Sequence, residues 1–100
     1  MTDPAPADRD RQRAEAVVRG TVQGVGFRRY VRKWARALDL DGWVRNEPDG
    51  TVRLVAEGDP AALDRLARLL WGGSPVADVQ AVEFVRSGAE GVEGGFEIRR

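Results

Sequence analysis

The sequence predicts an α+β domain in which two helices cover one face of a small antiparallel sheet. The chain has 100 residues, which is enough for one modest hydrophobic core but not for two. In some segments apolar residues alternate with polar ones, as in strands. In others the apolar residues recur at spacings of three or four residues, as in helices. These segments follow the order β-α-β-β-α-β, with a short strand at the end. Two such helices can cover only one face, which indicates a ferredoxin-like sandwich with four or five strands.

The first half of the chain contains a polar tail, a strand and a helix. Residues 1–13 are rich in Pro, Asp, Arg and Ala, so we expect a disordered tail and a domain spanning 14–100. Residues 15–22 form a short segment with several β-branched side chains, which predicts a strand. Residues 27–40 predict an amphipathic helix. Its apolar stripe consists of Phe27, Tyr30, Val31, Trp34 and Leu38.

A hairpin is expected next, because Pro48-Asp49-Gly50 separates two extended segments, residues 43–47 and 51–57. In the second segment Val52, Leu54 and Ala56 alternate with Thr51, Arg53 and Glu57. This alternation predicts one buried face and one face in water, with Glu57 on the wet side.

The second half is expected to contain one more helix and two strands. Asp59 and Pro60 are typical of a helix N-cap and first helical residue, and Gly72 closes that helix. Residues 79–86 and 96–99 have the extended pattern of strands.

The charge is balanced overall but unevenly distributed. There are 16 basic and 16 acidic residues, so a broadly basic nucleic-acid or membrane-surface protein is not indicated. Residues 9–36 nevertheless carry nine basic and two acidic side chains, a net +7. Most of these basic groups lie off the apolar stripe of the predicted helix, which favours a solvated helix face.

Two residue types are absent, and this narrows the possible chemistry. The chain has no Cys and no His, so a thiol nucleophile, a catalytic triad and imidazole acid–base catalysis are excluded. Any metal site would have to be built from carboxylates, which favours hard ions, and no cofactor is expected. No apolar run of about 18 residues is present, and the polar N-terminus lacks a signal-peptide core. A cytoplasmic protein without membrane contact is expected.

The segment between the first strand and the first helix is suited to an anion. Gly24 and Gly26 allow several backbone N–H groups to point into one concavity, beside the positive end of the helix. Arg28, in the first helical turn, has a planar fork of donors that fits phosphate oxygens. Glycines at such a place can also serve only to turn the chain. No Gly-Lys-Ser/Thr follows, so the segment is not a P-loop.

Two segments resemble the signatures of a known family. Residues 18–28, V-R-G-T-V-Q-G-V-G-F-R, are similar to the first signature of acylphosphatases, and residues 42–58, G-W-V-R-N-E-P-D-G-T-V-R-L-V-A-E-G, to the second. The resemblance covers roughly residues 15–98. Val31 departs from it where many members have Thr or Ser, and Gly26 departs where many have a larger residue.

The resemblance implies a metal-independent enzyme that hydrolyses the carboxyl–phosphate bond of acyl phosphates to a carboxylate and inorganic phosphate. Arg28 would bind the phosphate and Asn46 would orient the attacking water. The Asn46 amide can accept from a water and donate to phosphate, but it cannot act as a base. Inorganic phosphate would be product and inhibitor. The implied phosphate-binding residues are Gln23, Gly24, Val25, Gly26, Phe27 and Arg28.

Several alternatives remain open from the residues. Taken alone, Asn46 could be a residue that begins the turn and bonds nearby backbone. The V-G-F-R form also resembles the acylphosphatase-like domain of hydrogenase-maturation carbamoyltransferases, which are far larger and Cys-rich, so we expect a free-standing enzyme. A weakly catalytic or non-catalytic module that binds anions or carbamoyl phosphate would share the fold. RNA binding is disfavoured, because neither strand that would stack bases has an aromatic residue. We expect a monomer.

Overall fold

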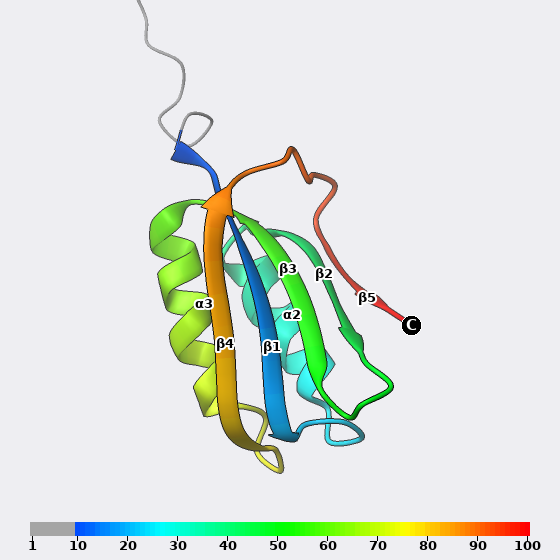
Figure 1. Ribbon diagram of the computed structural model, residues 1–100. Helices are drawn as coiled ribbons and strands as arrows, with labels where there is room; N and C mark the ends of the chain where they lie inside the picture. Colours follow the sequence, from blue (N-terminus) through cyan, green and yellow to red (C-terminus); the bar gives the residue numbers. More distant parts are fainter. Residues whose placement is uncertain (1–9) are drawn as a thin grey trace, which may run out of the picture.

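Five strands and two helices form the structure, a computed structural model that describes residues 10–100. Both helices cover the same face of the sheet (Figure 1), as the sequence predicts. The sheet order is β4-β1-β3-β2-β5. The elements are β1 (Gln12–Thr21), α2 (Phe27–Ala37), β2 (Asp41–Asn46), β3 (Val52–Gly58), α3 (Pro60–Gly72), β4 (Asp78–Gly88) and β5 (Phe96–Arg99).

The sheet is mixed, so the prediction of a purely antiparallel sheet is wrong at one edge. Strand β1 pairs antiparallel with β3 and β4, and β2 pairs antiparallel with β3. Strand β5 instead runs parallel to β2, from Gly42 opposite Phe96 to Arg45 opposite Arg99. The reason is the route of the chain: residues 89–95 cross from one edge to the other at the end where β4 stops (Figure 1). The chain must then return in the opposite direction to β4, which is the direction of β2.

The first strand begins at Gln12, inside the stretch expected to be a disordered tail. Contacts far along the chain hold this start. Arg11 bonds the Asp41 carboxylate at 3.0 Å and the Val92 carbonyl at 3.1 Å, and Arg13 bonds Glu57. Such partners give no local signal in the sequence. The remaining part of the expected tail, residues 1–9, lies outside the described residues.

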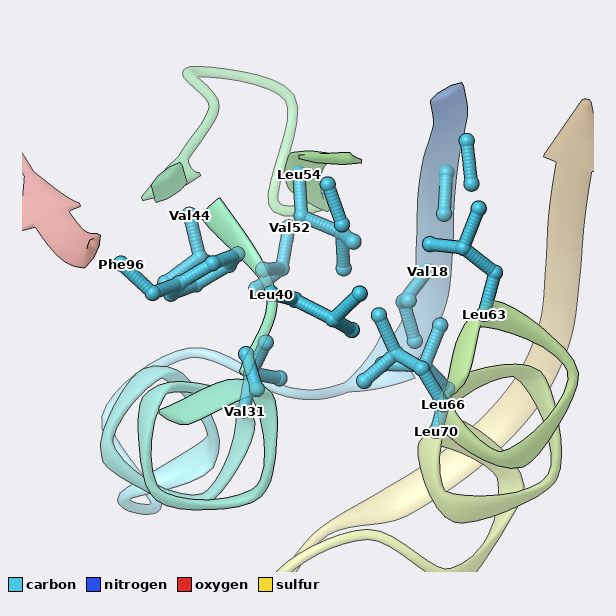
Figure 2. Packing of buried hydrophobic residues seen from close by; sticks show 14 of the residues in the cluster. Val18, Val31, Leu40, Val44, Val52, Leu54, Leu63, Leu66, Leu70 and Phe96 are labelled. Atoms are coloured by element: carbon cyan, nitrogen blue, oxygen red, sulfur yellow. The ribbon is translucent and has the colours of Figure 1, made fainter. Parts of the chain in front are cut away.

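The hydrophobic core lies between the sheet and the two helices. Figure 2 shows Val31 of α2 and Leu63, Leu66 and Leu70 of α3 facing the inward side chains of the strands, among them Leu54. Burial of each such leucine contributes about 1.5–3 kcal/mol. The core therefore joins both helices to the sheet.

Helix α2 ends earlier than its apolar stripe suggests. It stops at Ala37, three residues before the expected end at residue 40, and Asp39 has a positive φ of 55°. The N–H of Leu40 then bonds the carbonyl of Ala35 at 2.9 Å, which turns Leu40 back into the core. The stripe is confirmed in part, because Phe27 and Val31 are fully buried.

The prediction that Glu57 faces water is wrong. Its side chain lies on the face of β3 opposite the helices, yet it is 0% exposed because residues 90–92 fold over it. Its carboxylate accepts hydrogen bonds from Arg13 at 2.9 Å and from three backbone N–H groups at 2.9–3.0 Å. These N–H groups belong to Glu90, Gly91 and Val92. The carboxylate thus pins the crossing segment that leads to β5.

The same contacts set the acidity of Glu57. Burial by itself raises the pKa of the carboxyl group, but the hydrogen bonds from the Glu90 N–H, from Arg13 and from the other two N–H groups outweigh it. The net pKa lies below its ordinary value of 4.5. A lowered pKa stabilises the fold above the ordinary value, and this stabilisation is lost as the pH falls through the folded-state pKa.

We expect Glu57→Gln to lower the free energy of unfolding at neutral pH by about 1.5–3 kcal/mol, the range for a hydrogen bond to a charged group. The difference from the parent should shrink in acid, since Gln does not titrate. Urea unfolding over a pH series measures both effects. Glu83→Gln is the matched control, because within the described residues the Glu83 carboxylate forms only an exposed ion pair, with Arg19, and should contribute less than about 1 kcal/mol. Equal losses in both variants would contradict the role of Glu57.

Candidate active site

The loop between β1 and α2 has a backbone that leaves it open to a ligand. Gly24 and Gly26 have φ values of 75° and 77°, in the left-handed region that favours glycine. A Cβ added at either position would meet no atom within 4 Å, so both glycines border open space. Gly26 is also the N-cap of α2 and supplies no side-chain cap. The first turn of the helix is therefore uncovered.

The backbone donors of this loop are free. Within residues 10–100, no hydrogen bond to a protein group uses the N–H groups of residues 23–26. The N–H groups of Phe27, Arg28 and Arg29 occupy the first helical turn, where no carbonyl within the helix can accept from them. The first N–H with such a partner is that of Tyr30, which bonds the Gly26 carbonyl at 3.1 Å. These donors and the positive end of the helix dipole favour an anion.

Side chains, rather than the loop's own N–H groups, hold the loop in place. The amide of Gln23 donates to the carbonyls of Glu47 and Thr51 at 2.7 and 2.9 Å, which ties the loop to the hairpin between β2 and β3. On the other side, the Ser74 hydroxyl donates to the Val25 carbonyl at 2.8 Å. Gln23, predicted as part of the phosphate cradle, thus has its side chain engaged elsewhere, and only its backbone N–H is free.

A pocket of about 240 Å³ lies at the loop, which we call the loop pocket. It brings together four of the predicted residues, Gly24, Gly26, Phe27 and Arg28, whereas Gln23 and Val25 do not line it. Arg28 is half-buried and forms no ion pair with any carboxylate in residues 10–100. Its charge is therefore available to a bound anion. The lining consists of Val22, Gly24, Gly26, Phe27, Arg28, Arg29 and Ile98.

Asn46, the other predicted site residue, is the last residue of β2 and pairs with Val52. It lies two residues beyond the core residue Val44, so its side chain is on the helix-covered face of the sheet. Its Oδ1 atom is buried and has no hydrogen-bond partner in the part of the chain that the structure describes. A buried polar atom without a partner is costly and calls for an explanation, such as a bound water or ligand.

The hairpin contacts bring Asn46 to the same end of the sheet as the loop. The two carbonyls that accept from Gln23 belong to Glu47, which follows Asn46, and to Thr51, in the same turn. Asn46 does not itself line the loop pocket. The site therefore consists of the donors of the loop together with an unpartnered amide oxygen on the adjoining strand end.

The polar residues near Asn46 have structural partners. Arg45 points to the other face, where its guanidinium lies 4.7 Å from the Trp43 ring and bonds Glu47 at 2.8 Å. Asp49 accepts from the N–H and the hydroxyl of Thr51, and this side-chain hydrogen bond is the main cause that lowers its pKa. Asp49 thus acts as a turn residue, as the sequence predicts.

Two further findings concern metals and membranes. In residues 10–100, no group of three or more carboxylate side chains is placed to hold a metal ion. No helix in this part of the chain has the length and apolar character needed to span a bilayer.

Four residues of the site, Val22, Arg29, Ser74 and Ile98, are absent from the predicted site residues. Ser74 reaches Val25 across 49 positions of the chain, so no local pattern marks it. Ile98 and Arg29 line the loop pocket because β5 lies beside α2. In the sequence, Arg29 is indistinguishable from the other basic residues of the helix.

Comparison with known proteins gives a consistent result. The family model described as acylphosphatase matches residues 14–98. The chain is 47% identical over 89 residues to an acylphosphatase of Salinibacter ruber, an alignment that covers 89% of this chain and 94% of the relative.

Solved structures agree. The acylphosphatase of Coxiella burnetii superposes with a TM-score of 0.88 at 36% identity, over 96% of this chain and 100% of that one. The acylphosphatase of Bacillus subtilis superposes with a TM-score of 0.85 at 37% identity, over 89% of this chain and 99% of that one. The resemblance of the two signature segments is thereby confirmed, and the chain belongs to the acylphosphatase family of hydrolases.

Proposed function

We propose that this chain hydrolyses acyl phosphates, with the phosphoryl group bound by the loop donors and Arg28 and the attacking water oriented by Asn46. The observation that carries the proposal is the set of free N–H groups and the unpaired Arg28 guanidinium around one pocket. The buried, unpartnered Oδ1 of Asn46 at the same end of the sheet supports the role given to the water.

Binding depends on the geometry of the donors. The phosphoryl oxygens accept from the backbone N–H groups of residues 24–28, and the Arg28 fork holds two of them at once. Charge on these oxygens is spread further in the transition state, where positioning and electrostatic stabilisation supply most of the catalysis. A fixed donor such as Arg28 contributes about 2–4 kcal/mol to this step, by analogy with oxyanion sites.

The reaction needs no acid or base from the protein. The water oxygen attacks phosphorus while the bond from phosphorus to the acyl oxygen breaks. The leaving group is a carboxylate, which is stable without a proton. The phosphate product is H₂PO₄⁻, which keeps both protons of the water, so the reaction balances with no proton left over. An amide at Asn46 that only orients the water is sufficient.

The direct test is the hydrolysis of benzoyl phosphate by the purified chain in the presence of EDTA. We expect turnover that the chelator does not change, followed as the loss of benzoyl phosphate absorbance. A well-folded chain without turnover would contradict the proposed function and leave the alternative of a module that only binds anions.

Arg28→Ala should lower kcat/KM for benzoyl phosphate by about 30-fold to 900-fold, since about 2–4 kcal/mol of transition-state stabilisation is removed. Inhibition by inorganic phosphate should weaken as well, because Arg28 also binds the ground state. Arg68→Ala removes an exposed arginine of α3 and serves as the control. We expect it to leave both kcat/KM and the inhibition constant of phosphate unchanged. Activity within about tenfold of the parent in Arg28→Ala would show that the site is assigned to the wrong residue.

Asn46→Ala should lower kcat by a similar factor but leave inhibition by phosphate nearly unchanged, because the amide acts on the water rather than on the bound anion. Measuring kcat and the phosphate inhibition constant on the same preparation separates the two roles. Arg45→Ala, on the adjacent residue that points to the other face, controls for disturbance of the strand end. Equal loss of phosphate binding in Asn46→Ala would argue against a water-orienting role.

Gln23→Met keeps the length of the side chain but removes both donors to the hairpin. We expect a loss of about 1–2 kcal/mol in the free energy of unfolding and about a tenfold fall in kcat, because the loop and Asn46 are no longer held in register. Gln80→Met, at an exposed position of β4, is the matched control and should change neither quantity. Unchanged kcat in Gln23→Met would mean that the tether does not position the site.

A further inference from the structure

A second pocket of about 320 Å³ adjoins the loop pocket; we call it the arginine pocket. The two pockets share Arg28, Arg29 and Ile98 in their linings, so they are adjacent. The arginine pocket is completed by Arg32 of α2 and by Arg100, which follows β5. Among residues 10–100, no acidic side chain lines either pocket.

The arginines of this pocket have no protein partners. In residues 10–100, the guanidinium groups of Arg28, Arg29, Arg32 and Arg100 form neither a hydrogen bond nor an ion pair with another residue. Arg36, farther along the same helix, behaves differently, because its Nε donates to the Phe96 carbonyl at 3.0 Å and docks β5 against α2.

The placement of these groups follows from the packing of β5 against α2. Arg28 and Arg32 lie four residues apart and Arg29 and Arg32 three apart, so all three occupy neighbouring positions on the helix surface. Ile98, partly buried against the core, is the apolar residue of the pocket lining. Like charges held this close repel one another, and an anion placed among them removes that repulsion.

We infer that the arginine pocket receives the acyl group of the substrate and favours acyl groups that carry a second anionic group, a carboxylate or a phosphate. This inference rests on the proposed function, because it assigns the part of the substrate that the loop does not bind. Arg29 and Arg32 are the residues that select the second anion, and Ile98 packs against the carbon skeleton between the two charges.

The test compares two substrates of nearly equal shape, 4-carboxybenzoyl phosphate and 4-carbamoylbenzoyl phosphate, which differ in one negative charge. The rigid ring prevents the carboxylate from attacking its own acyl carbon. The parent chain should have a higher kcat/KM for the carboxylate compound, and this preference should shrink as ionic strength rises. A 4-phosphonobenzoyl compound in a third arm shows whether a carboxylate or a phosphate is the better second anion.

Arg29→Gln and Arg32→Gln should each reduce the ratio of the two kcat/KM values by about threefold to fivefold, the upper range for partly exposed ion pairs. Arg68→Gln on α3 removes the same charge at an exposed position outside both pockets and should leave the ratio unchanged. If Arg68→Gln lowered the ratio of the two kcat/KM values by the same factor, the preference would come from general attraction between the chain and the anion. That result would overturn the inference.

The remaining outcomes separate this inference from the proposed function. Hydrolysis of both compounds with equal kcat/KM in the parent, or an unchanged ratio in both pocket variants, would refute the arginine pocket while leaving acyl phosphate hydrolysis intact. Hydrolysis of neither compound by the folded parent would contradict the proposed function itself, and the inference with it.

Discussion

A loop whose N–H groups are left free for a ligand cannot use those same groups to hold itself. This constraint explains the contacts around residues 23–28. The amide of Gln23, in the loop itself, donates to two carbonyls of the hairpin, and the Ser74 hydroxyl donates to a loop carbonyl from the other side. The buried ring of Phe27 anchors the loop to the core. Because all three contacts spare the backbone donors, the loop is ordered before an anion arrives. Pre-ordering of this kind lowers the cost of binding and of catalysis.

Charge is treated differently on the two sides of the sheet. On the face without helices, most charged side chains have partners: Arg13 pairs with the buried Glu57 and Arg53 with Glu15. The guanidinium of Arg99 also lies 5.0 Å from the Trp43 ring. Near the start of α2, Arg28, Arg29 and Arg32 have no such partners among residues 10–100. The chain has equal numbers of acidic and basic residues, but they are distributed unevenly. Charged side chains form ion pairs on the outer face of the sheet, whereas within the described part of the chain the arginines of the arginine pocket do not.

Local sequence signals predicted the elements well. The Pro48-Asp49-Gly50 turn, the Asp59 cap and the change of apolar spacing after Gly26 mark features that depend on neighbouring residues only. The errors have a common cause. Glu57 alternates correctly onto the outer face, but residues 90–92, more than thirty positions away, cover that face. The parallel pairing of β5 likewise depends on where the chain crosses the sheet.

The sequence by itself determined the fold class, the family resemblance, and Arg28 and Asn46 as candidate residues, because these depend on residue type, spacing and short motifs. Only the tertiary structure decided which donors stay free, which charges stay unpaired and what surrounds the loop. Each of these depends on contacts between segments distant in the chain, such as Ser74 with Val25 and Ile98 with α2. A hydrogen bond or an ion pair requires a partner in space, and a linear pattern does not specify which partner the packing supplies.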